Sequence, residues 1–370
     1  MKSNKRTGPM VPPAFVVRGL EAIVQGLDRL RNRLLPPPLV VLQHMVLNLV
    51  VSRCLYVAAE LKLADLLKDG PRDVDDLAAA TGAHPDALHR ILRALASVGF
   101  FVETDEGRYG TTRLSECLRS DAPGSMLASA RYAGADWAFA GWSEMLATAR
   151  TGRTYYENVH GKSFFGWYDE SPERREVFDA SMTSMSAMAI PAIVAAYDFS
   201  AFGSVVDVGG GEGGLLTAIL RASPRARGTL FDLPQVIARV EREGLRADDD
   251  VAGRTALVAG DFFAELPPAH DAYVLKWILH DWADADAARI LAACRRAVRP
   301  GGKLVIVEML IGERNQYSLA KLSDVGMLTL TGGRERTLAE FRRLLAGSGF
   351  ALRLSRQTAA GYSVLEAVPV

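Results

Sequence analysis

The sequence predicts an α/β protein in which a Rossmann-like domain follows an N-terminal helical domain of the winged-helix type. From Ser204 onward, short β-branched runs alternate with helical patterns, which is typical of a parallel sheet covered by helices on both faces. The first of these runs leads into a glycine-rich turn at residues 209–214 that opens a helix. Nearer the N-terminus, two helical patterns precede a hairpin pattern, and this order indicates a winged helix.

A chain of 370 residues is longer than a single hydrophobic core usually accommodates, so we expect more than one domain. We predict an N-terminal extension with an amphipathic helix at 1–37, a winged-helix dimerisation domain at 38–120, a helical linker that also lines a substrate pocket at 121–195, and the Rossmann-like domain at 196–370.

The composition argues against several classes of protein. The chain carries 43 basic and 43 acidic residues, so no overall field attracts nucleic acid or an anionic membrane. Its three widely spaced cysteines fit neither a disulfide framework nor a metal site, and we expect a cytoplasmic protein without a metal. The most apolar stretch, 39–51, is interrupted by Gln43, His44 and Asn48 and is shorter than the ~20 residues of a membrane span, so we expect no span.

Two apolar helical patterns begin the chain. Between residues 20 and 34, leucine, isoleucine and valine recur at helical spacing, and three prolines then end the pattern. We interpret this segment as a helix docked on its own chain or on a partner, with a membrane-surface anchor as the alternative. From about 39 to 67 the pattern is apolar almost all round, which implies burial on several sides. A homodimer interface would supply that burial.

The winged helix also raises the hypothesis of a DNA-binding regulator, because His89, Arg90 and Arg93 would lie on the outer face of its second helix. Six aspartates in the same segment would repel phosphates. We therefore favour dimerisation and expect no nucleic-acid partner.

Aromatic residues and methionines accumulate between about 121 and 195. Such residues are most often core residues. As a group next to the sheet domain, they could also form the apolar walls of a pocket for a small molecule.

Five strands are predicted in the second half of the chain, at 205–208, 228–231, 255–258, 272–275 and 303–308. In sheets of this kind, ligands bind beyond the carboxyl ends of the strands. The residues that follow the five strands are therefore the candidate site.

The turn after the first strand suits a nucleotide-like ligand. Gly209, Gly211 and Gly214 let the backbone approach a ligand at a helix N-terminus, and Asp232, at the end of the next strand, suits a ribose diol. These residues alone do not separate a nicotinamide cofactor from S-adenosylmethionine.

Further motifs separate the two cofactors. Asp261 and Phe262 follow the third strand, where an acidic side chain beside a flat apolar one can recognise adenine. Residues 276–282 read Lys-Trp-Ile-Leu-His-Asp-Trp, and residues 332–337 read Gly-Gly-Arg-Glu-Arg-Thr. With Val-Asp-Val-Gly-Gly-Gly at 206–211 and Phe-Asp-Leu-Pro at 231–234, these motifs resemble the caffeic acid type of O-methyltransferases, including bacterial members that modify polyketides and antibiotics. The resemblance runs from about residue 39 to the C-terminus.

The resemblance implies a class I methyltransferase fold that binds S-adenosyl-L-methionine and needs no metal. The cofactor-binding residues that it implies are Ser186, Gly209, Asp232, Asp261, Phe262 and Lys276. The catalytic residues that it implies are His280, Glu308 and Glu335, with His280 as the general base. We expect the acceptor to contact Met182, Trp277, Asp281 and Met327.

Elementary chemistry agrees with this assignment. A phenol of pKa ~10 is a poor nucleophile at neutral pH, and an imidazole of pKa ~6.5 can remove its proton as the methyl group is attacked. Two carboxylates can orient the ring and stabilise the imidazolium that forms. We therefore predict an S-adenosylmethionine-dependent O-methyltransferase that acts on a hydroxyl of a small, aromatic or polyketide-like acceptor.

Several alternatives stay open. The same fold and cofactor can serve N- or C-methylation, or non-methylating hydroxylation, decarboxylation or pericyclic chemistry, and a nicotinamide oxidoreductase is a more distant reading. The sequence does not name the acceptor or the hydroxyl that is methylated.

Overall fold

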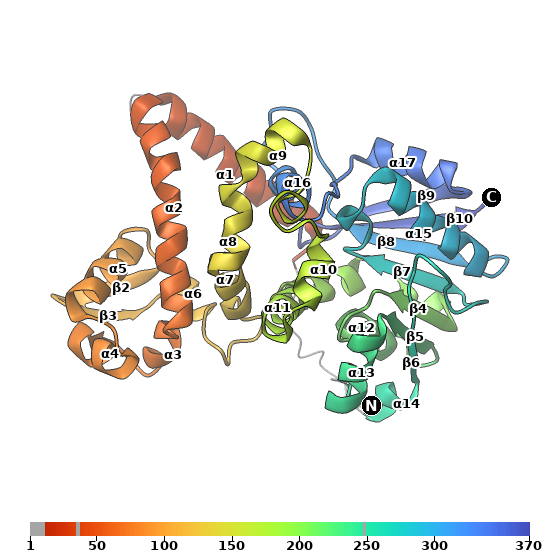
Figure 1. The fold of residues 1–370 in the computed structure, drawn as a ribbon, viewed down its shortest axis with the longest axis horizontal. Helices are drawn as coiled ribbons and strands as arrows, with labels where there is room; N and C mark the ends of the chain where they lie inside the picture. Colours follow the sequence, from red (N-terminus) through yellow and green to blue (C-terminus); the bar gives the residue numbers. More distant parts are fainter. Residues whose placement is uncertain (1–11, 35–37, 246, 248) are drawn as a thin grey trace, which may run out of the picture. The chain divides into compact units, whose positions relative to one another are not determined.

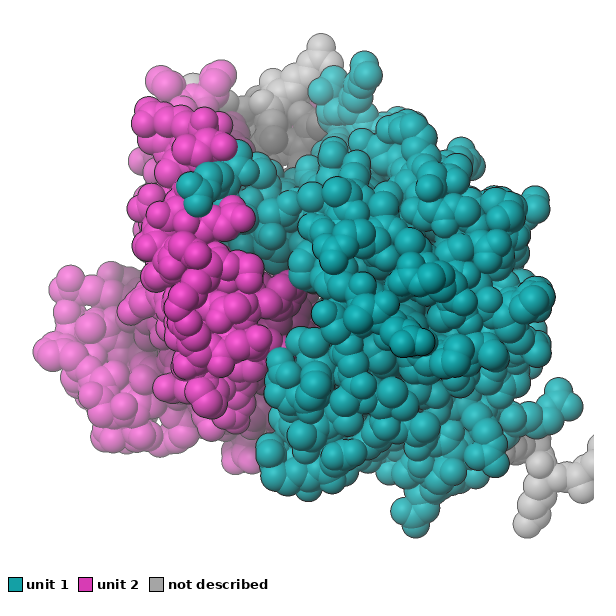
Figure 2. Space-filling model, turned by 45° about the vertical axis from the view of Figure 1, so that its right-hand side comes forward, with its two compact units in different colours: residues 1–26, 152–154, 186–370 teal, residues 27–151, 155–185 magenta. Residues whose placement is uncertain are grey.

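The computed structural model describes residues 12–34, 38–245, 247 and 249–370. The chain divides into two compact units, drawn in different colours in Figure 2. One unit comprises residues 1–26, 152–154 and 186–370, and the other comprises residues 27–151 and 155–185. The predicted parallel sheet belongs to the first unit and the predicted winged helix to the second.

A seven-stranded sheet forms the centre of the first unit (Figure 1), in the order β6-β5-β4-β7-β8-β10-β9. The first five strands in this order are parallel, and β10 is antiparallel to both β8 and β9. The strands are β4 Ser204–Val208, β5 Arg227–Asp232, β6 Thr255–Ala259, β7 Ala272–Lys276, β8 Lys303–Glu308, β9 Phe350–Gln357 and β10 Ser363–Pro369. All five predicted strands are present, whereas β9 and β10 were not predicted.

Helices cover both faces of this sheet. Val206 packs into a core with side chains of α15 and α17, whereas its neighbour Val205 packs into a second core with side chains of α12 and α13. Successive residues of a strand point to opposite faces, so burial on both sides explains the continuous apolar runs. The helices of this region are α12 Gly214–Ala222, α13 Pro234–Glu243, α14 Asp249–Gly253, α15 Asp284–Ala297, α16 Leu319–Leu330 and α17 Leu338–Gly347, with 3₁₀ turns η2 Phe199–Ala201 and η3 Leu279–Asp281.

The second unit contains the predicted winged helix. Its elements are β1 Arg72–Asp73, α4 Val74–Thr81, α5 Pro85–Ser97, β2 Phe101–Asp105, β3 Arg108–Thr111 and α6 Arg113–Glu116. The three strands pair in the order β1-β3-β2. Proline is well tolerated in the first turn of a helix, and α5 begins with Pro85 and buries Leu88, Leu92 and Leu95.

The apolar segment before the winged helix is two helices rather than one. α2 spans Pro38–Glu60, and α3 spans Leu63–Leu66. Lys62 between them has a φ of 50°, which is the left-handed conformation that ends a helix. Along the first half of α2, many apolar side chains are exposed, namely Leu39, Leu42, Met45, Val46, Leu47, Leu49 and Val50. The single chain therefore leaves the expected dimer surface uncovered.

Two described helices, α2 and α11 Pro172–Ala196, are long and apolar enough to cross a membrane by length and composition. Core helices of soluble proteins and signal sequences pass the same test, so this finding is weak evidence for a span. The expected absence of a span stays a prediction. Helix α1, Ala14–Leu34, belongs partly to each unit and also exposes apolar side chains such as Leu20, Ile23 and Leu27.

The aromatic segment is helical, as predicted. Its elements are α7 Leu127–Gly134, α8 Asp136–Ser143, α9 Met145–Thr151, the π-helix η1 Tyr156–His160, α10 Phe164–Asp169 and the start of α11. Tyr156, Phe164, Trp167 and Tyr168 are buried, and their rings contact one another. These four residues form core of the second unit, and a role of the segment in lining an acceptor pocket stays a prediction.

Candidate active site

The candidate cofactor residues lie at one edge of the sheet because the strands that carry them are parallel. Each follows or ends a different strand: Gly209 follows β4, Asp232 ends β5, Asp261 follows β6 and Lys276 ends β7. Glu308 ends the next strand, β8. The parallel register therefore gathers residues that are far apart in the sequence.

The glycine turn has no room for side chains at its first position. Gly209 has a φ of 68°, and a Cβ atom there would lie 2.5 Å from Ile278 Cδ1. Its amide donates a hydrogen bond to the Phe231 carbonyl oxygen at 2.8 Å. Gly211 has a φ of 58°, with open space where its Cβ would lie. The turn thus presents bare backbone at the start of α12, where the helix N-terminus favours a negatively charged group such as a carboxylate.

Asp232 is tied to this turn. Its Oδ2 accepts a hydrogen bond from the Gly211 amide at 2.8 Å, and its Oδ1 accepts one from the Leu233 amide at 2.7 Å. A carboxylate has about four lone-pair sites, so both oxygens keep capacity for the hydroxyls of a ribose. The carboxylate is held in place before any ligand binds.

The candidate adenine residues are Asp261 and Phe262. Asp261 is exposed and accepts a hydrogen bond from the Phe263 amide at 2.8 Å, which orients its carboxylate. The Phe262 ring lies edge-on to Trp282 and 3.7 Å from the position of a Cβ on Gly209. The Phe262 ring therefore lies next to the glycine turn, and the contact of Asp261 and Phe262 with adenine stays a prediction.

Asp207 is buried next to the glycine turn, and the half-buried Lys276, at the end of the neighbouring strand β7, interacts with it electrostatically. Burial lowers the pKa of Lys276 to about 8, against the opposing effect of Asp207 and Glu308. Burial also raises the pKa of Asp207 to about 6, against the opposing effect of Lys276. The Lys276 ammonium lies 3.8 Å from the centre of the Trp277 ring.

Ser186 reaches the same region through α11. Ile190, one helical turn later, lies 3.3 Å from the position of a Cβ on Gly214, so this part of α11 packs on the start of α12. Residues four apart share a helix face, which puts Ser186 on the side of the glycine turn. Its contact with the cofactor stays a prediction.

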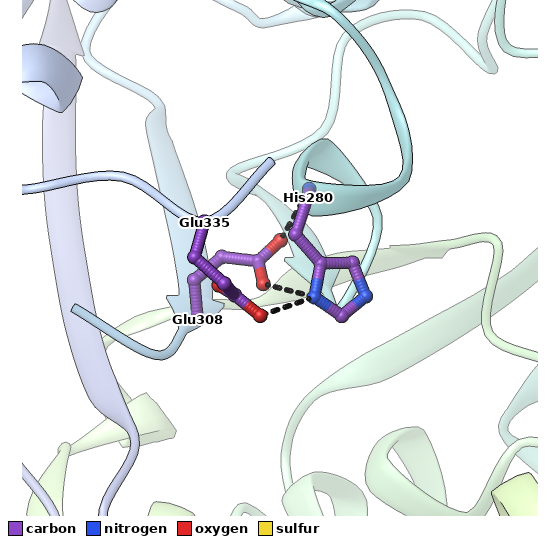
Figure 3. A group of neighbouring side chains, drawn as sticks. All are labelled: His280, Glu308 and Glu335. Carbon is purple, nitrogen blue, oxygen red and sulfur yellow. Dashed lines mark hydrogen bonds and ion pairs between the residues drawn. The ribbon is translucent and has the colours of Figure 1, made fainter. Parts of the chain in front are cut away.

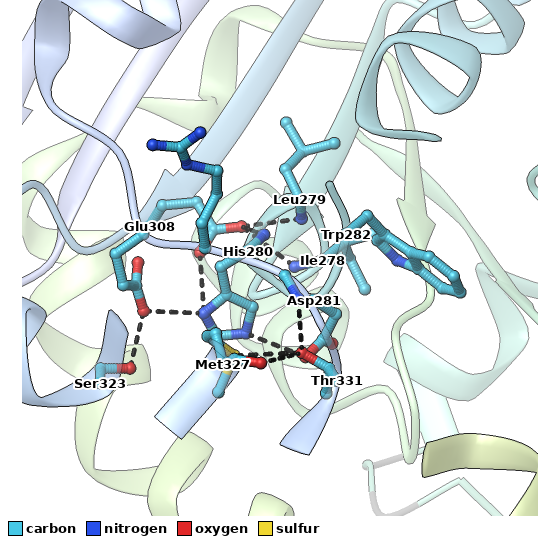
Figure 4. A network of polar contacts seen from close by, with 12 residues as sticks. Ile278, Leu279, His280, Asp281, Trp282, Glu308, Ser323, Met327 and Thr331 are labelled. Atoms are coloured by element: carbon cyan, nitrogen blue, oxygen red, sulfur yellow. Dashed lines mark hydrogen bonds and ion pairs between the residues drawn. The ribbon is translucent and has the colours of Figure 1, made fainter. Parts of the chain in front are cut away.

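Glu308 holds the backbone of the turn that carries His280. Its Oε1 accepts hydrogen bonds from the amides of Ile278, Leu279 and His280 at 3.1, 3.0 and 3.4 Å (Figure 4). These amides begin the short η3 turn and have no partner within it. The buried carboxylate therefore fixes the position from which the imidazole projects.

The carboxylates of Glu335 and Glu308 approach the imidazole of His280 from its Nδ1 side (Figure 3). Its Nδ1 lies 3.0 Å from Glu335 Oε1 and 3.6 Å from Glu308 Oε2. Its Nε2, on the other side of the ring, lies 3.8 Å from Asp281 Oδ1. Both glutamates are fully buried, whereas 14% of the His280 side chain is exposed.

These surroundings set the charge of the ring. Burial lowers the pKa of His280, but the carboxylates of Glu308, Asp281 and Glu335 outweigh burial and raise the pKa to about 10. Burial also raises the pKa values of Glu308 and Asp281. In the ligand-free protein the imidazole is therefore mostly protonated at neutral pH.

Arg336 connects the loop of Glu335 to the turn of His280, and sequence reasoning missed it. Its guanidinium is almost fully buried and donates to the carbonyl oxygens of Leu279 at 2.7 Å and Trp282 at 2.8 Å. The Arg334 amide donates to the His280 carbonyl oxygen at 2.8 Å. The only sequence signal was a second arginine within the Gly-Gly-Arg-Glu-Arg-Thr motif.

Two residues of α16 hold Glu335, and neither was predicted. Ser323 Oγ donates a hydrogen bond to Glu335 Oε1 at 2.8 Å, and Asp324 Oδ1 accepts one from the Glu335 amide at 2.9 Å. A serine and an aspartate in a helix carry no recognisable motif. Their role depends on the packing of α16 against a loop that follows it.

The other predicted acceptor contacts lie in different places. The Trp277 ring packs on Tyr362, with the ring centres 4.9 Å apart, and joins one of the two cores of the sheet. Met327 lies in α16, and its sulfur is 3.8 Å from Thr331 Oγ1 (Figure 4). Met182 belongs to the second unit. The expected contacts of these three residues with the acceptor stay predictions.

His280, Glu308 and Glu335 also resemble a cation site, because their ligand atoms all lie within 4.8 Å of one another. However, Glu308 Oε1 is already occupied by three amides, and Glu335 Oε1 by Ser323 and His280. The Oε2 atoms of both glutamates are buried and have no hydrogen-bond partner among the described residues, so the expected absence of a metal stays a prediction.

Comparison with known proteins identifies the family. A model described as an O-methyltransferase domain matches residues 142–351, which is more than half of the chain. A model described as an O-methyltransferase dimerisation domain matches residues 43–121. The chain belongs to the O-methyltransferase family.

Of three individual relatives, two are O-methyltransferases and one is a hydroxylase. The chain is 43% identical over 331 residues to a phenazine O-methyltransferase of Lysobacter antibioticus, covering 89% of this chain and 96% of the relative. It is 37% identical over 334 residues to the aclacinomycin 10-hydroxylase of Streptomyces purpurascens, covering 86% and 87%. A solved O-methyltransferase of neocarzinostatin biosynthesis, in complex with S-adenosylmethionine and 2-hydroxy-5-methyl naphthoic acid, matches with a TM-score of 0.74 and 36% identity over 86% of this chain and 96% of that one.

The predictions of fold, family, cofactor and activity are therefore confirmed. The protein is an S-adenosylmethionine-dependent O-methyltransferase with an N-terminal dimerisation domain and a small acceptor. The sheet order is that of a class I methyltransferase fold. N-methylation, C-methylation and non-methylating chemistry are not favoured, and the roles of individual residues are taken up below.

Proposed function

We propose that His280 is the general base of this O-methyltransferase and that its acceptor is an aromatic hydroxyl. The observation that carries the proposal is the 3.0 Å contact between His280 Nδ1 and Glu335 Oε1. A proton on Nδ1 is bonded to the carboxylate, so the lone pair of the neutral ring is on Nε2. That nitrogen is the atom available to an acceptor hydroxyl.

Glu335 and Glu308 support this base in different ways. Glu335 bonds the ring nitrogen directly, which fixes the tautomer and stabilises the imidazolium after proton transfer. Glu308 bonds three amides of the turn and places the ring. Asp281, 3.8 Å from Nε2, lies on the acceptor side of the ring and can accept a hydrogen bond from the acceptor.

The high pKa of His280 in the ligand-free protein has to be overcome before the residue acts as a base. When bound, S-adenosylmethionine supplies an electrophilic methyl group on a positively charged sulfonium. A nearby positive charge disfavours the protonated imidazole and lowers the pKa of His280. The residues that would hold the cofactor are Gly209, Asp232, Asp261 and Phe262.

The relatives support the proposed acceptor class. The phenazine and naphthoic acid enzymes act on or bind fused aromatic rings, and both match most of this chain. We propose a fused or single aromatic ring that carries a hydroxyl as the acceptor, and a cytoplasmic homodimer as the form of the enzyme. The exposed apolar side of α2 supports the dimer.

The test is a panel of hydroxyphenazines, hydroxynaphthoates and hydroxybenzoates, screened by mass spectrometry for the gain of one methyl group. With the best acceptor, His280→Ala is expected to lower kcat by ~10²–10⁴ and to leave cofactor affinity nearly unchanged, because a general base acts in the transition state. The loss should shrink for acceptors of lower pKa, which arrive already ionised.

Two results would count against the base. An equal loss for acidic and non-acidic acceptors would make His280 a positioning residue. If His280→Ala loses no activity, another group removes the proton.

A further inference from the structure

Glu335 Oε1 accepts two hydrogen bonds at once. One comes from His280 Nδ1 at 3.0 Å, and the other from Ser323 Oγ at 2.8 Å. Asp324, the next residue of α16, accepts a hydrogen bond from the Glu335 amide. Helix α16 therefore holds Glu335 at both its backbone and its carboxylate. Ser323 does not bond the imidazole directly but is connected to it through the Glu335 carboxylate.

Three carboxylates face the imidazole from three different segments. They belong to Glu308 at the end of β8, Asp281 in η3 and Glu335 in the loop before α17. All three favour the protonated ring, and the ring has to lose this proton before it can accept one from the acceptor.

Two further titratable groups face these carboxylates without removing the excess of negative charge. Lys276, at the end of β7, interacts with Glu308 but also with Asp207. Tyr362 faces Glu335 and Glu308, and burial together with these two carboxylates raises the pKa of its hydroxyl to about 12, so it stays neutral. A hydrogen-bond donor that withdraws negative charge from one of these carboxylates would therefore make the protonated form of His280 less favourable.

Ser323 is such a donor. A hydroxyl that donates to a carboxylate oxygen withdraws charge from that oxygen, and two donors on one oxygen compete. The hydrogen bond from Ser323 therefore weakens the pull of Glu335 Oε1 on the imidazolium. Without the hydroxyl, the same oxygen would bind the imidazolium more tightly.

We propose that Ser323 is a positioning residue that limits the basicity of His280 through Glu335, and that it thereby sets the lowest pH at which the methyltransferase works. This inference rests on the proposed role of His280 as the base. It assigns to α16 a function in the chemistry, in addition to its packing.

The test is a direct titration of His280 in the ligand-free, full-length protein. Histidine labelled with ¹³C in the imidazole is incorporated, and the His280 signal is identified as the one lost in His280→Ala. In Ser323→Ala we expect the pKa of His280 to rise by about half a unit to one unit, which is the size of one ordinary hydrogen bond. Ser323→Thr keeps a hydroxyl at this position and is expected to match the parent.

The same variants are then compared in their pH profiles of kcat/KM with the best acceptor of the panel. The acid limb of this profile reports the free enzyme, and in Ser323→Ala it should move to higher pH by the same amount as the titration. Activity at neutral pH falls, and raising the pH restores it. A role in packing alone would instead lower the rate equally at every pH.

Several results would overturn the inference: an unmoved pKa, a pKa shifted downward, a uniform loss of rate, or a threonine variant that behaves like alanine. These results are separable from failure of the proposed base. If His280→Ala abolishes turnover while Ser323→Ala leaves the pKa of His280 unmoved, only the inference about Ser323 fails. If His280→Ala keeps full activity, the proposed base fails whatever the titration shows.

Discussion

Asp232 is predicted to bind the ribose because of its place in the sequence, at the end of the second predicted strand. The structure adds that the carboxylate is fixed by two amides, from Gly211 and Leu233. Gly209 could be inferred in the same way, because only glycine fits a turn with this φ and this neighbour.

Substitution of Asp232 tests the cofactor site. Asp232→Asn loses the negative charge toward the ribose hydroxyls, and a hydrogen bond to a charged group contributes about 1.5–3 kcal/mol. We expect S-adenosylmethionine to bind roughly ten- to a hundred-fold more weakly in calorimetry. Asp286→Asn is the control, because Asp286 pairs with Arg289 on the surface of α15. Unchanged affinity in Asp232→Asn would contradict the assignment.

Ser323 and Arg336 could not be inferred from the sequence, and the reason is physical. Ser323 acts through the Glu335 carboxylate, which belongs to a loop, and Arg336 acts through backbone carbonyl oxygens of a distant turn. Neither kind of partner has a signature in the sequence. Motifs reveal residues that touch a shared ligand, whereas residues that support them are visible only after packing is known.

Among the elements, the η3 turn and the loop at 332–336 are the ones that bring His280, the proposed base, and Glu335 together. Gly333 shows how close they are, since a Cβ on it would lie 2.0 Å from the His280 carbonyl oxygen. Arg336 then bonds carbonyl oxygens on either side of His280.

Removal of the Arg336 guanidinium should loosen both segments. Arg336→Met leaves the buried carbonyls of Leu279 and Trp282 without this donor, and we expect a loss of about 2–5 kcal/mol of stability, measured by chemical denaturation. Arg334→Met is the matched control, because its guanidinium is half exposed and its ion pairs are longer, at 3.7 and 3.8 Å. Equal losses in the two variants would show that Arg336 has no special role in holding the turn.

Some elements followed from the sequence and others did not. The five parallel strands were predicted because their apolar runs are buried on both faces. β9, at the edge of the sheet, carries Arg353 and Arg356 and is partly exposed, so it has no such run. The break at Lys62 was also missed, because lysine gives no signal for a left-handed conformation.

At the scale of the whole molecule, the exposed apolar residues of α2 require an explanation. Leu42, Met45 and Val46 are each more than half exposed in the single chain. The matched dimerisation domain covers residues 43–121 and therefore begins within α2. A surface of this kind is expected to be buried against a second copy of the chain.

Light scattering at micromolar concentration tests this expectation. The parent should have twice the 40.0 kDa mass of the chain. Met45→Glu should shift the mass toward that of the monomer, because association would bury a charge. Leu146→Glu, at an exposed position in α9 outside the matched dimerisation domain, is the control and should stay dimeric. A monomeric parent would refute the dimer.

The bonds between the η3 turn and the loop at 332–336 also bear on how such an enzyme can diversify. The Arg334 amide and the Arg336 guanidinium tie the two segments through backbone carbonyls, so His280 and Glu335 form one block whose internal contacts do not involve the acceptor. Mutations elsewhere in the chain can then change which molecules are methylated without disturbing the reacting groups. Related enzymes can in this way keep the same reaction while their substrates change during evolution.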